Sequence, residues 1–184
     1  MKPMLHREIH PKASIPADME GPIIEFRSSD ETLDRYKERI SVAGWRLENY
    51  RQNPVVQNAH NYGSLSDTIG KSLITEVRGL QSAGSHDSTT QPLNGSTPYL
   101  FQRIQFAVEE NPMAKVAYGL YKGGFLRAVS VGFIPLSWEN GSKEAGYQRK
   151  YLEQELLEVS AVSIPANPDA LQLGLKGGAV TRSD

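Results

Sequence analysis

Apolar and polar residues alternate over several short stretches of the chain, a pattern typical of β-strands that bury one face. Between these stretches lie clusters of Gly, Pro, Asn, Asp and Ser that favour turns. The expected strands cover residues 23–29, 55–56, 68–77, 99–106, 126–136 and 156–164.

Apolar residues follow helical spacing most clearly over residues 112–122. Asn111 can cap this helix, Pro112 suits its first position, and Gly123 ends it. The face expected to pack on the core consists of Met113, Val116, Ala117, Leu120 and Tyr121. A helical turn is expected over residues 48–52, and Asp169 is expected to cap a short helix through Leu175.

The elements predict an α+β fold, with a mostly antiparallel, closed β-barrel and flanking helices. Residues 1–22 are rich in proline and predict a flexible arm, and residues 177–184 predict a frayed tail. The domain itself is expected over residues 23–176. Polar stretches at 84–97 and 139–149 predict a surface loop and a hairpin-like connection.

The composition excludes several classes of function. The 184 residues include 20 basic and 21 acidic residues, for a net charge of −1, and the basic residues are scattered. This balance gives no support for a nucleic-acid or membrane surface. Because the chain has no cysteine, it has no disulfide, no thiol nucleophile and no thiolate metal site. No apolar stretch reaches the length of about 20 residues that a membrane helix needs.

Ser130 lies in a strand whose neighbours are unusually small. Side chains alternate between the two faces of a strand, so Ala128, Ser130 and Gly132 share one face. Those small neighbours leave room for the backbone of a substrate to approach the hydroxyl. The alternative is an ordinary strand serine whose hydroxyl bonds a neighbouring backbone group.

Glu158 lies on a largely apolar strand face, between Leu156 and Ser160. An unpaired carboxylate there is costly to bury, so it needs a partner. A histidine that the carboxylate orients would serve, whereas an edge position in water or a pair with arginine would need no such role.

His60 follows the apolar pair Val55-Val56 at a predicted junction of strand and loop. The other three histidines lie in the predicted arm or in the polar loop. A serine, a histidine and a carboxylate together are what a serine nucleophile requires. Ser130 would then be the nucleophile, His60 its base and Glu158 the group that orients His60, although the third member is open. A surface histidine in a loop is the alternative for His60.

The motifs of this chain resemble those of the prohead maturation proteases of tailed bacteriophages. The resemblance runs from about residue 23 to 168. The motifs that carry it are Asp34-Arg35, Gly44-Trp45 with Tyr50, Asn53-Pro54-Val55-Val56 before His60, Ile69-Gly70, the helix from Ala114 to Gly124, Ala128 to Pro135, Glu155 to Ser160, and Pro165 to Pro168. In that family pattern His60 and Ser130 match the catalytic histidine and serine.

The family is similar in fold to herpesvirus assemblin, which uses Ser, His and His. Glu158 occupies the place of the third member, and the loop from Pro165 to Pro168 has no arginine to stabilise an oxyanion. The resemblance implies a serine endopeptidase without a cofactor. Its substrates would be the major capsid protein or its scaffolding segment, and the protease itself.

The resemblance places the protein in the host cytoplasm, inside the immature capsid, and is compatible with a homodimer. Two other functions fit the same residues. One is a catalytically silent capsid assembly or scaffolding protein that keeps the barrel, and the other is an unrelated esterase or amidase.

Overall fold

The computed structural model describes residues 21–80 and 97–175. Nearly all of the predicted arm, most of the predicted polar loop and the predicted tail therefore lie outside the described residues. Two helices are described, α1 (Glu48–Gln52) and α2 (Pro112–Lys122), with 3₁₀ turns at Val42–Gly44 and Leu65–Asp67. The strands are β1 (Ile23–Asp30), β2 (Glu38–Ile40), β3 (Trp45–Arg46), β4 (Val55–Asn58), β5 (Thr68–Arg78), β6 (Tyr99–Phe106), β7 (Val129–Asn140), β8 (Arg149–Ala161) and β9 (Gln172–Leu175).

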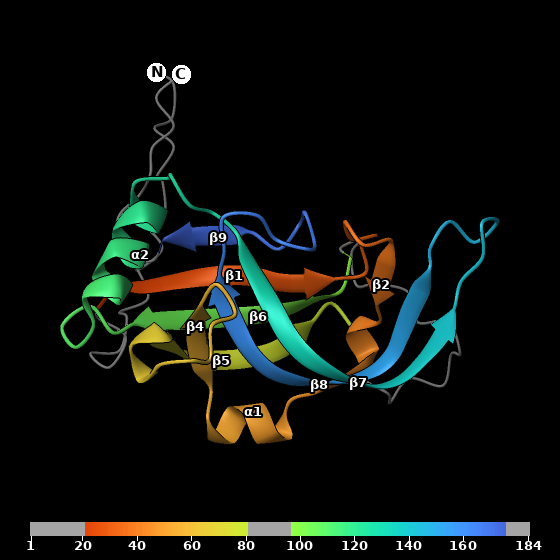
Figure 1. Cartoon of the computed structure of the whole chain (residues 1–184), viewed down its shortest axis with the longest axis horizontal. Coiled ribbons are helices and arrows are strands. Elements are labelled where there is room, and N and C mark those ends of the chain that lie inside the picture. The colour runs from red at the N-terminus through yellow and green to blue at the C-terminus, as the bar shows by residue number, and fades with distance from the viewer. Residues whose placement is uncertain (1–20, 81–96, 176–184) are drawn as a thin grey trace, which may run out of the picture.

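All the strands join one curled sheet in the order β2-β8-β4-β5-β6-β1-β9, with β3 and β7 also paired to β8 (Figure 1). The predominance of strands over helices is confirmed, but the predicted closed antiparallel barrel is wrong. Strands β2, β3 and β4 run parallel to β8, so the sheet is mixed and forms a half-barrel. Outside the named strands, Ala128 and Leu171 form one isolated antiparallel bridge, which links the segment before β7 to the segment before β9. A local pattern reveals strands but not their distant partners, which is why the parallel ladders escaped prediction.

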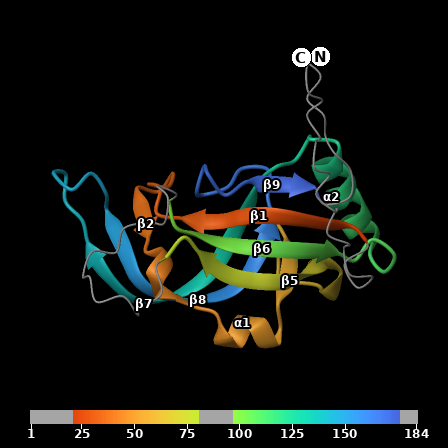
Figure 2. The same cartoon turned by 180° about the vertical axis from the view of Figure 1, so that it is seen from behind.

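The hairpin of β7 and β8 is longer than predicted. The two strands pair from Val129 with Ala161 out to Asn140 with Arg149, so both ends of the predicted polar connection belong to the ladder. Figures 1 and 2 show this hairpin reaching from the middle of the sheet to the end of the molecule opposite α2.

The helix predicted after Asp169 is wrong, because this segment forms strand β9 on the free edge of β1. Asp169 does not cap a helix. Its carboxylate accepts a hydrogen bond from the Thr32 hydroxyl instead. Leucines alternate with Gln172 and Gly174 along this segment, a strand pattern that the local helix signal obscured.

Helix α2 has the predicted boundaries and cap, since the Asn111 side chain accepts the Met113 N–H at 2.9 Å. Its buried face was only half predicted. Ala117 and Tyr121 are buried together with Ala114, whereas Met113, Val116 and Leu120 are exposed. Both sets repeat every three to four residues, so only the position of the sheet decides which set is covered. No helix in the described ranges is long and apolar enough to cross a membrane.

One hydrophobic core joins residues of the sheet with Tyr50 of α1 and with Ala114, Ala117 and Tyr121 of α2. Its aromatic members contact one another edge to face, as in Phe26 with Tyr121 and Trp45 with Phe133. The aliphatic residues of the core include Ile24, Val42, Leu47, Val56, Ile69, Leu100, Ile104, Val129, Leu156 and Val159.

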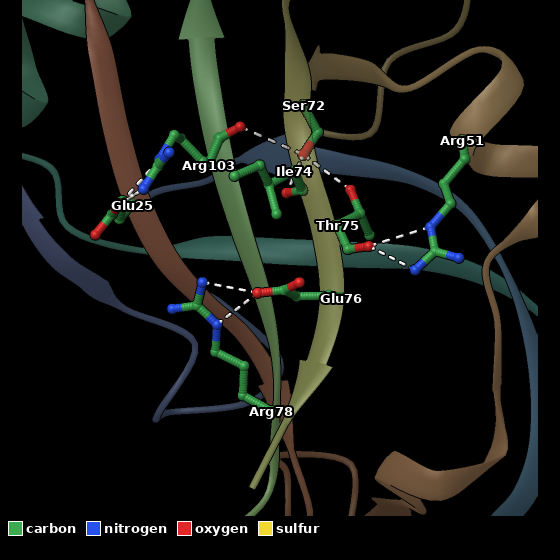
Figure 3. A network of polar contacts seen from close by, with 8 residues as sticks. All are labelled: Glu25, Arg51, Ser72, Ile74, Thr75, Glu76, Arg78 and Arg103. Carbon is green, nitrogen blue, oxygen red and sulfur yellow. Dashed lines mark hydrogen bonds and ion pairs between the residues drawn. The ribbon is translucent and has the colours of Figure 1, made fainter. Parts of the chain in front are cut away.

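Polar side chains connect the neighbouring strands β1, β5 and β6 in the middle of the sheet (Figure 3). Arg103 on β6 bonds Glu25 on β1 at 2.6 Å. Arg51, at the end of α1, donates twice to the Thr75 carbonyl of β5. Because α1 leads directly into β4, this bond fixes the start of the strand that precedes His60.

Candidate active site

Three strand ends meet at the candidate site, and β8 lies between the other two (Figure 1). Ser130 on β7 pairs with Ser160 on β8, and Ser160 pairs with Gln57 on β4. Since β4 and β8 are parallel, their carboxyl ends lie at the same edge of the sheet, where antiparallel β7 begins. The register therefore brings the start of β7 beside the residues that follow β4.

His60 lies in a tight turn just after β4. The Asn61 N–H donates to the Asn58 carbonyl, and the two central residues, Ala59 and His60, have φ values of 52° and 58°. Non-glycine residues adopt such angles rarely, and each costs about 1–3 kcal/mol. Bonds to β8 hold the turn, because the Ala59 N–H donates to the Ala161 carbonyl and the His60 N–H to the Ser160 hydroxyl.

The ring of His60 is hydrogen-bonded to Glu158. Nδ1 of His60 lies 2.6 Å from Oε1 of Glu158, across 98 residues of sequence. Glu158 is 2% exposed, so its carboxylate has no access to bulk water. Because Nδ1 is engaged, Nε2 is the ring nitrogen left for proton exchange.

Both oxygens of Glu158 have partners. The Ser160 hydroxyl donates to Oε2 at 2.7 Å, and the Tyr62 hydroxyl donates to Oε1 at 3.3 Å. Burial first, and then the negative charge and hydrogen bond of Glu158, raise the pKa of Tyr62, which keeps its hydroxyl a donor. These contacts supply the partner that a buried carboxylate requires.

Gly132 makes room for the Glu158 carboxylate. The two residues pair across β7 and β8, and a Cβ at position 132 would lie 2.2 Å from Oε1. Any side chain at this position would therefore displace the group that bonds His60.

Ser130 and His60 line the same cavity, which has a volume of about 320 Å³. Ser130 is 8% exposed, and it occupies the strand face shared with Gly132, as predicted. Within the described part of the chain, its hydroxyl forms no hydrogen bond with the His60 ring. In the structure, His60 is hydrogen-bonded to Glu158, and Ser130 lies in the lining of the same cavity as His60.

Sequence reasoning did not predict the hydrogen bonds that Ser160 and Tyr62 make to Glu158. It predicted that Gly132 leaves room for the backbone of a substrate, whereas in the structure Gly132 leaves room for the Glu158 carboxylate. Strand alternation placed Ser160 on the same face as Glu158. The contact of the Ser160 hydroxyl with the His60 N–H depends on the pairing of β4 with β8, which the sequence does not show.

In residues 21–80 and 97–175, no three His, Asp or Glu side chains gather to hold a metal ion. The chemistry available is that of a hydroxyl, an imidazole and a buried carboxylate. Such a set suits nucleophilic attack on a carbonyl with proton transfer through the imidazole.

A model of one protein family matches residues 79–179, which is more than half of the chain. The matched segment includes Ser130 and Glu158, whereas His60 precedes it. Comparisons with curated proteins and with solved structures returned no significant match. The family described by the matching model is the caudovirus prohead serine protease, and this chain belongs to it.

Proposed function

We propose that this protein is a serine endopeptidase in which Ser130 is the nucleophile, His60 the general base and Glu158 the group that orients His60. The observation that carries the proposal is the 2.6 Å bond from His60 Nδ1 to buried Glu158. That bond fixes the ring so that Nε2 is free to serve the cavity shared with Ser130.

In the first step, the Ser130 oxygen attacks the carbonyl carbon of the scissile peptide bond while His60 Nε2 takes the hydroxyl proton. His60 then gives that proton to the leaving amine, and the peptide C–N bond breaks. Water attacks the acyl-enzyme through the same base, which releases the new carboxyl end and restores Ser130. The Glu158 carboxylate stabilises the imidazolium during both steps.

The lack of a hydrogen bond between the Ser130 hydroxyl and the His60 ring is compatible with this role. Catalytic hydrogen bonds are often loose in a free enzyme and tighten when substrate enters. The low exposure of Ser130, with small neighbours on its strand face, leaves it reachable by a backbone but shielded from bulk water.

Family membership supports the major capsid protein, or its scaffolding segment, as substrate, inside the assembling prohead of the infected cell. We include the protease itself among the substrates. A single domain over residues 23–176 would carry this activity, and we propose no cofactor for it.

The test is to incubate the purified protein with its cognate capsid protein and to record intact masses over time. We expect defined cleavage products from the wild type. Ser130→Ala should lower the rate by at least about 1,000-fold. Ser137→Ala, the same substitution on the same strand, should cleave like the wild type. Equal products from Ser130→Ala and the wild type would refute the assignment of the nucleophile.

A further inference from the structure

The cavity beside Ser130 and His60 has a lining whose fixed charges are all negative. Asp30, Asp34 and Glu38 line it, and no lysine or arginine of the described residues does. These three carboxylates come from the end of β1 and from the turn and strand that follow it. They belong to a part of the chain that holds none of the proposed catalytic residues, yet they line the same cavity.

Asp30 is ionised but largely balanced. Burial would raise its pKa, but hydrogen bonds from Asn167, Thr32 and Arg27 outweigh burial and lower it. The Arg27 guanidinium lies 3.2 Å from the carboxylate. Asp30 thus holds the cavity wall in place and adds little net charge.

Asp34 carries an unbalanced negative charge, and Glu38 is only weakly balanced. One oxygen of Asp34 accepts the backbone N–H groups of Tyr36 and Glu38, both at 2.8 Å, and no cation of the described residues pairs with it. Glu38 accepts the Tyr151 hydroxyl at 3.0 Å, and Arg149 reaches it only at 3.9 Å. Both residues are half-buried, so water screens them less than it screens surface carboxylates.

Ser29 adds an independent sign that the cavity takes a ligand. It is fully buried, lines the same cavity, and its hydroxyl has no hydrogen-bond partner in the structure. Buried hydroxyls are nearly always paired, so an orphan one invites a polar group from a ligand. Tyr36, which is largely exposed, adds an aromatic ring to the lining, and aromatic faces attract cations.

We infer that this cavity is a substrate subsite for a basic side chain, lysine or arginine, of the polypeptide being cleaved. The inference rests on the proposed function, since it places the basic residue at a fixed distance from the scissile bond. The ammonium or guanidinium group would meet the carboxylate of Asp34 and the carboxylate of Glu38, which Arg149 balances only from 3.9 Å, and donate to the Ser29 hydroxyl. A glutamate or aspartate at the same position would be repelled.

The first test is to digest a peptide library with the wild-type protein and to map the cleavage sites by mass spectrometry. We expect lysine and arginine to be enriched about tenfold at one position relative to the cut, as charge-assisted hydrogen bonds of this kind predict. Asp34→Asn and Glu38→Gln should each reduce that enrichment several-fold. The asparagine keeps the oxygen that accepts the two backbone N–H groups, so the turn is preserved.

Glu76→Gln is the matched control, because Glu76 lies on β5 outside the cavity and pairs with Arg78. It should keep the wild-type preference. Cleavage without a basic preference, or a preference that survives both cavity variants, would overturn the subsite and leave the proposed function standing.

A second measurement covers the case in which no peptide is cut, which would count against the proposed function. Ser130→Ala protein is titrated with a lysine-containing peptide and with its glutamine counterpart. We expect the lysine peptide to bind about tenfold more tightly than the glutamine peptide. This difference should disappear in protein that carries both Ser130→Ala and Asp34→Asn. Equal affinities would overturn the subsite whatever the catalytic result.

Discussion

Replacing Gly132 with alanine should lower the activity of the protease roughly 100-fold while leaving its fold intact. The new Cβ would lie 2.2 Å from Oε1 of Glu158 and 3.0 Å from the Tyr62 hydroxyl. Ordinary contact begins at 3.4 Å, so the carboxylate must retreat by about 1.2 Å. The end of a glutamate side chain can move, but this one also bonds His60 and Ser160.

The size of the effect follows from that displacement. A retreat of this length lengthens the 2.6 Å bond to His60 Nδ1 beyond hydrogen-bond range unless the ring follows. A misplacement of about 1 Å in a catalytic group costs roughly 100-fold in rate. That factor corresponds to about 2.7 kcal/mol of activation free energy.

The assay is kcat/KM on a cleavable capsid-derived peptide, with the melting temperature recorded in parallel. Gly119→Ala is the control, since a Cβ there meets nothing within 4 Å and alanine favours the helix by about 1 kcal/mol. We expect Gly119→Ala to keep full activity. Wild-type activity in folded Gly132→Ala protein would show that Glu158 does not orient the base.

Three further changes test the surroundings of the site. Ser160→Ala removes both the donor to Glu158 and the acceptor for the strained His60 backbone. We therefore expect kcat to fall about tenfold and a single melting transition at lower temperature. An unchanged kcat would mean that Ser160 has only a packing role in the strand. Tyr62→Phe loses one longer bond to Glu158 and should cost less than about threefold in kcat, and a larger loss would reveal a direct role. Asp30→Asn should lower the free energy of unfolding by about 2 kcal/mol at pH 7. Because the pKa of Asp30 is lowered on folding, its contribution is present above the ordinary value of 3.8 and is lost as the pH falls through the folded value. Urea unfolding at pH 7 and at stepwise lower pH should therefore show the difference between the two proteins narrowing in acid, and a constant difference would contradict this.

Sequence reasoning reached the strands and the cap of α2 because their signals are local. Alternation revealed β5 and β6, and Asn111 with Pro112 marked the helix start. The parallel ladders to β8 depend on residues about 100 positions apart, which no local pattern encodes. The exposed stripe of α2 was misassigned for a related reason, since its apolar spacing equals that of the buried stripe.

For the site, strand position, side-chain chemistry and the family resemblance suggested Ser130, His60 and Glu158 as candidates, and the structure adds the bond between the last two. What sequence could not provide was the support around them. Ser160 and Gly132 matter here through the register of β7 and β8, and the strain at His60 is a backbone property that residue type does not reveal.

The position of β8 between β4 and β7 has a consequence for folding kinetics. The β7–β8 hairpin closes a short loop and can form early, whereas β4 must find β8 across about 100 residues. The bond between His60 and Glu158 exists only once that late, long-range ladder has formed. A nascent or partly folded chain would therefore lack the proposed catalytic base in its working position, and proteolysis would begin only after β4 has paired with β8.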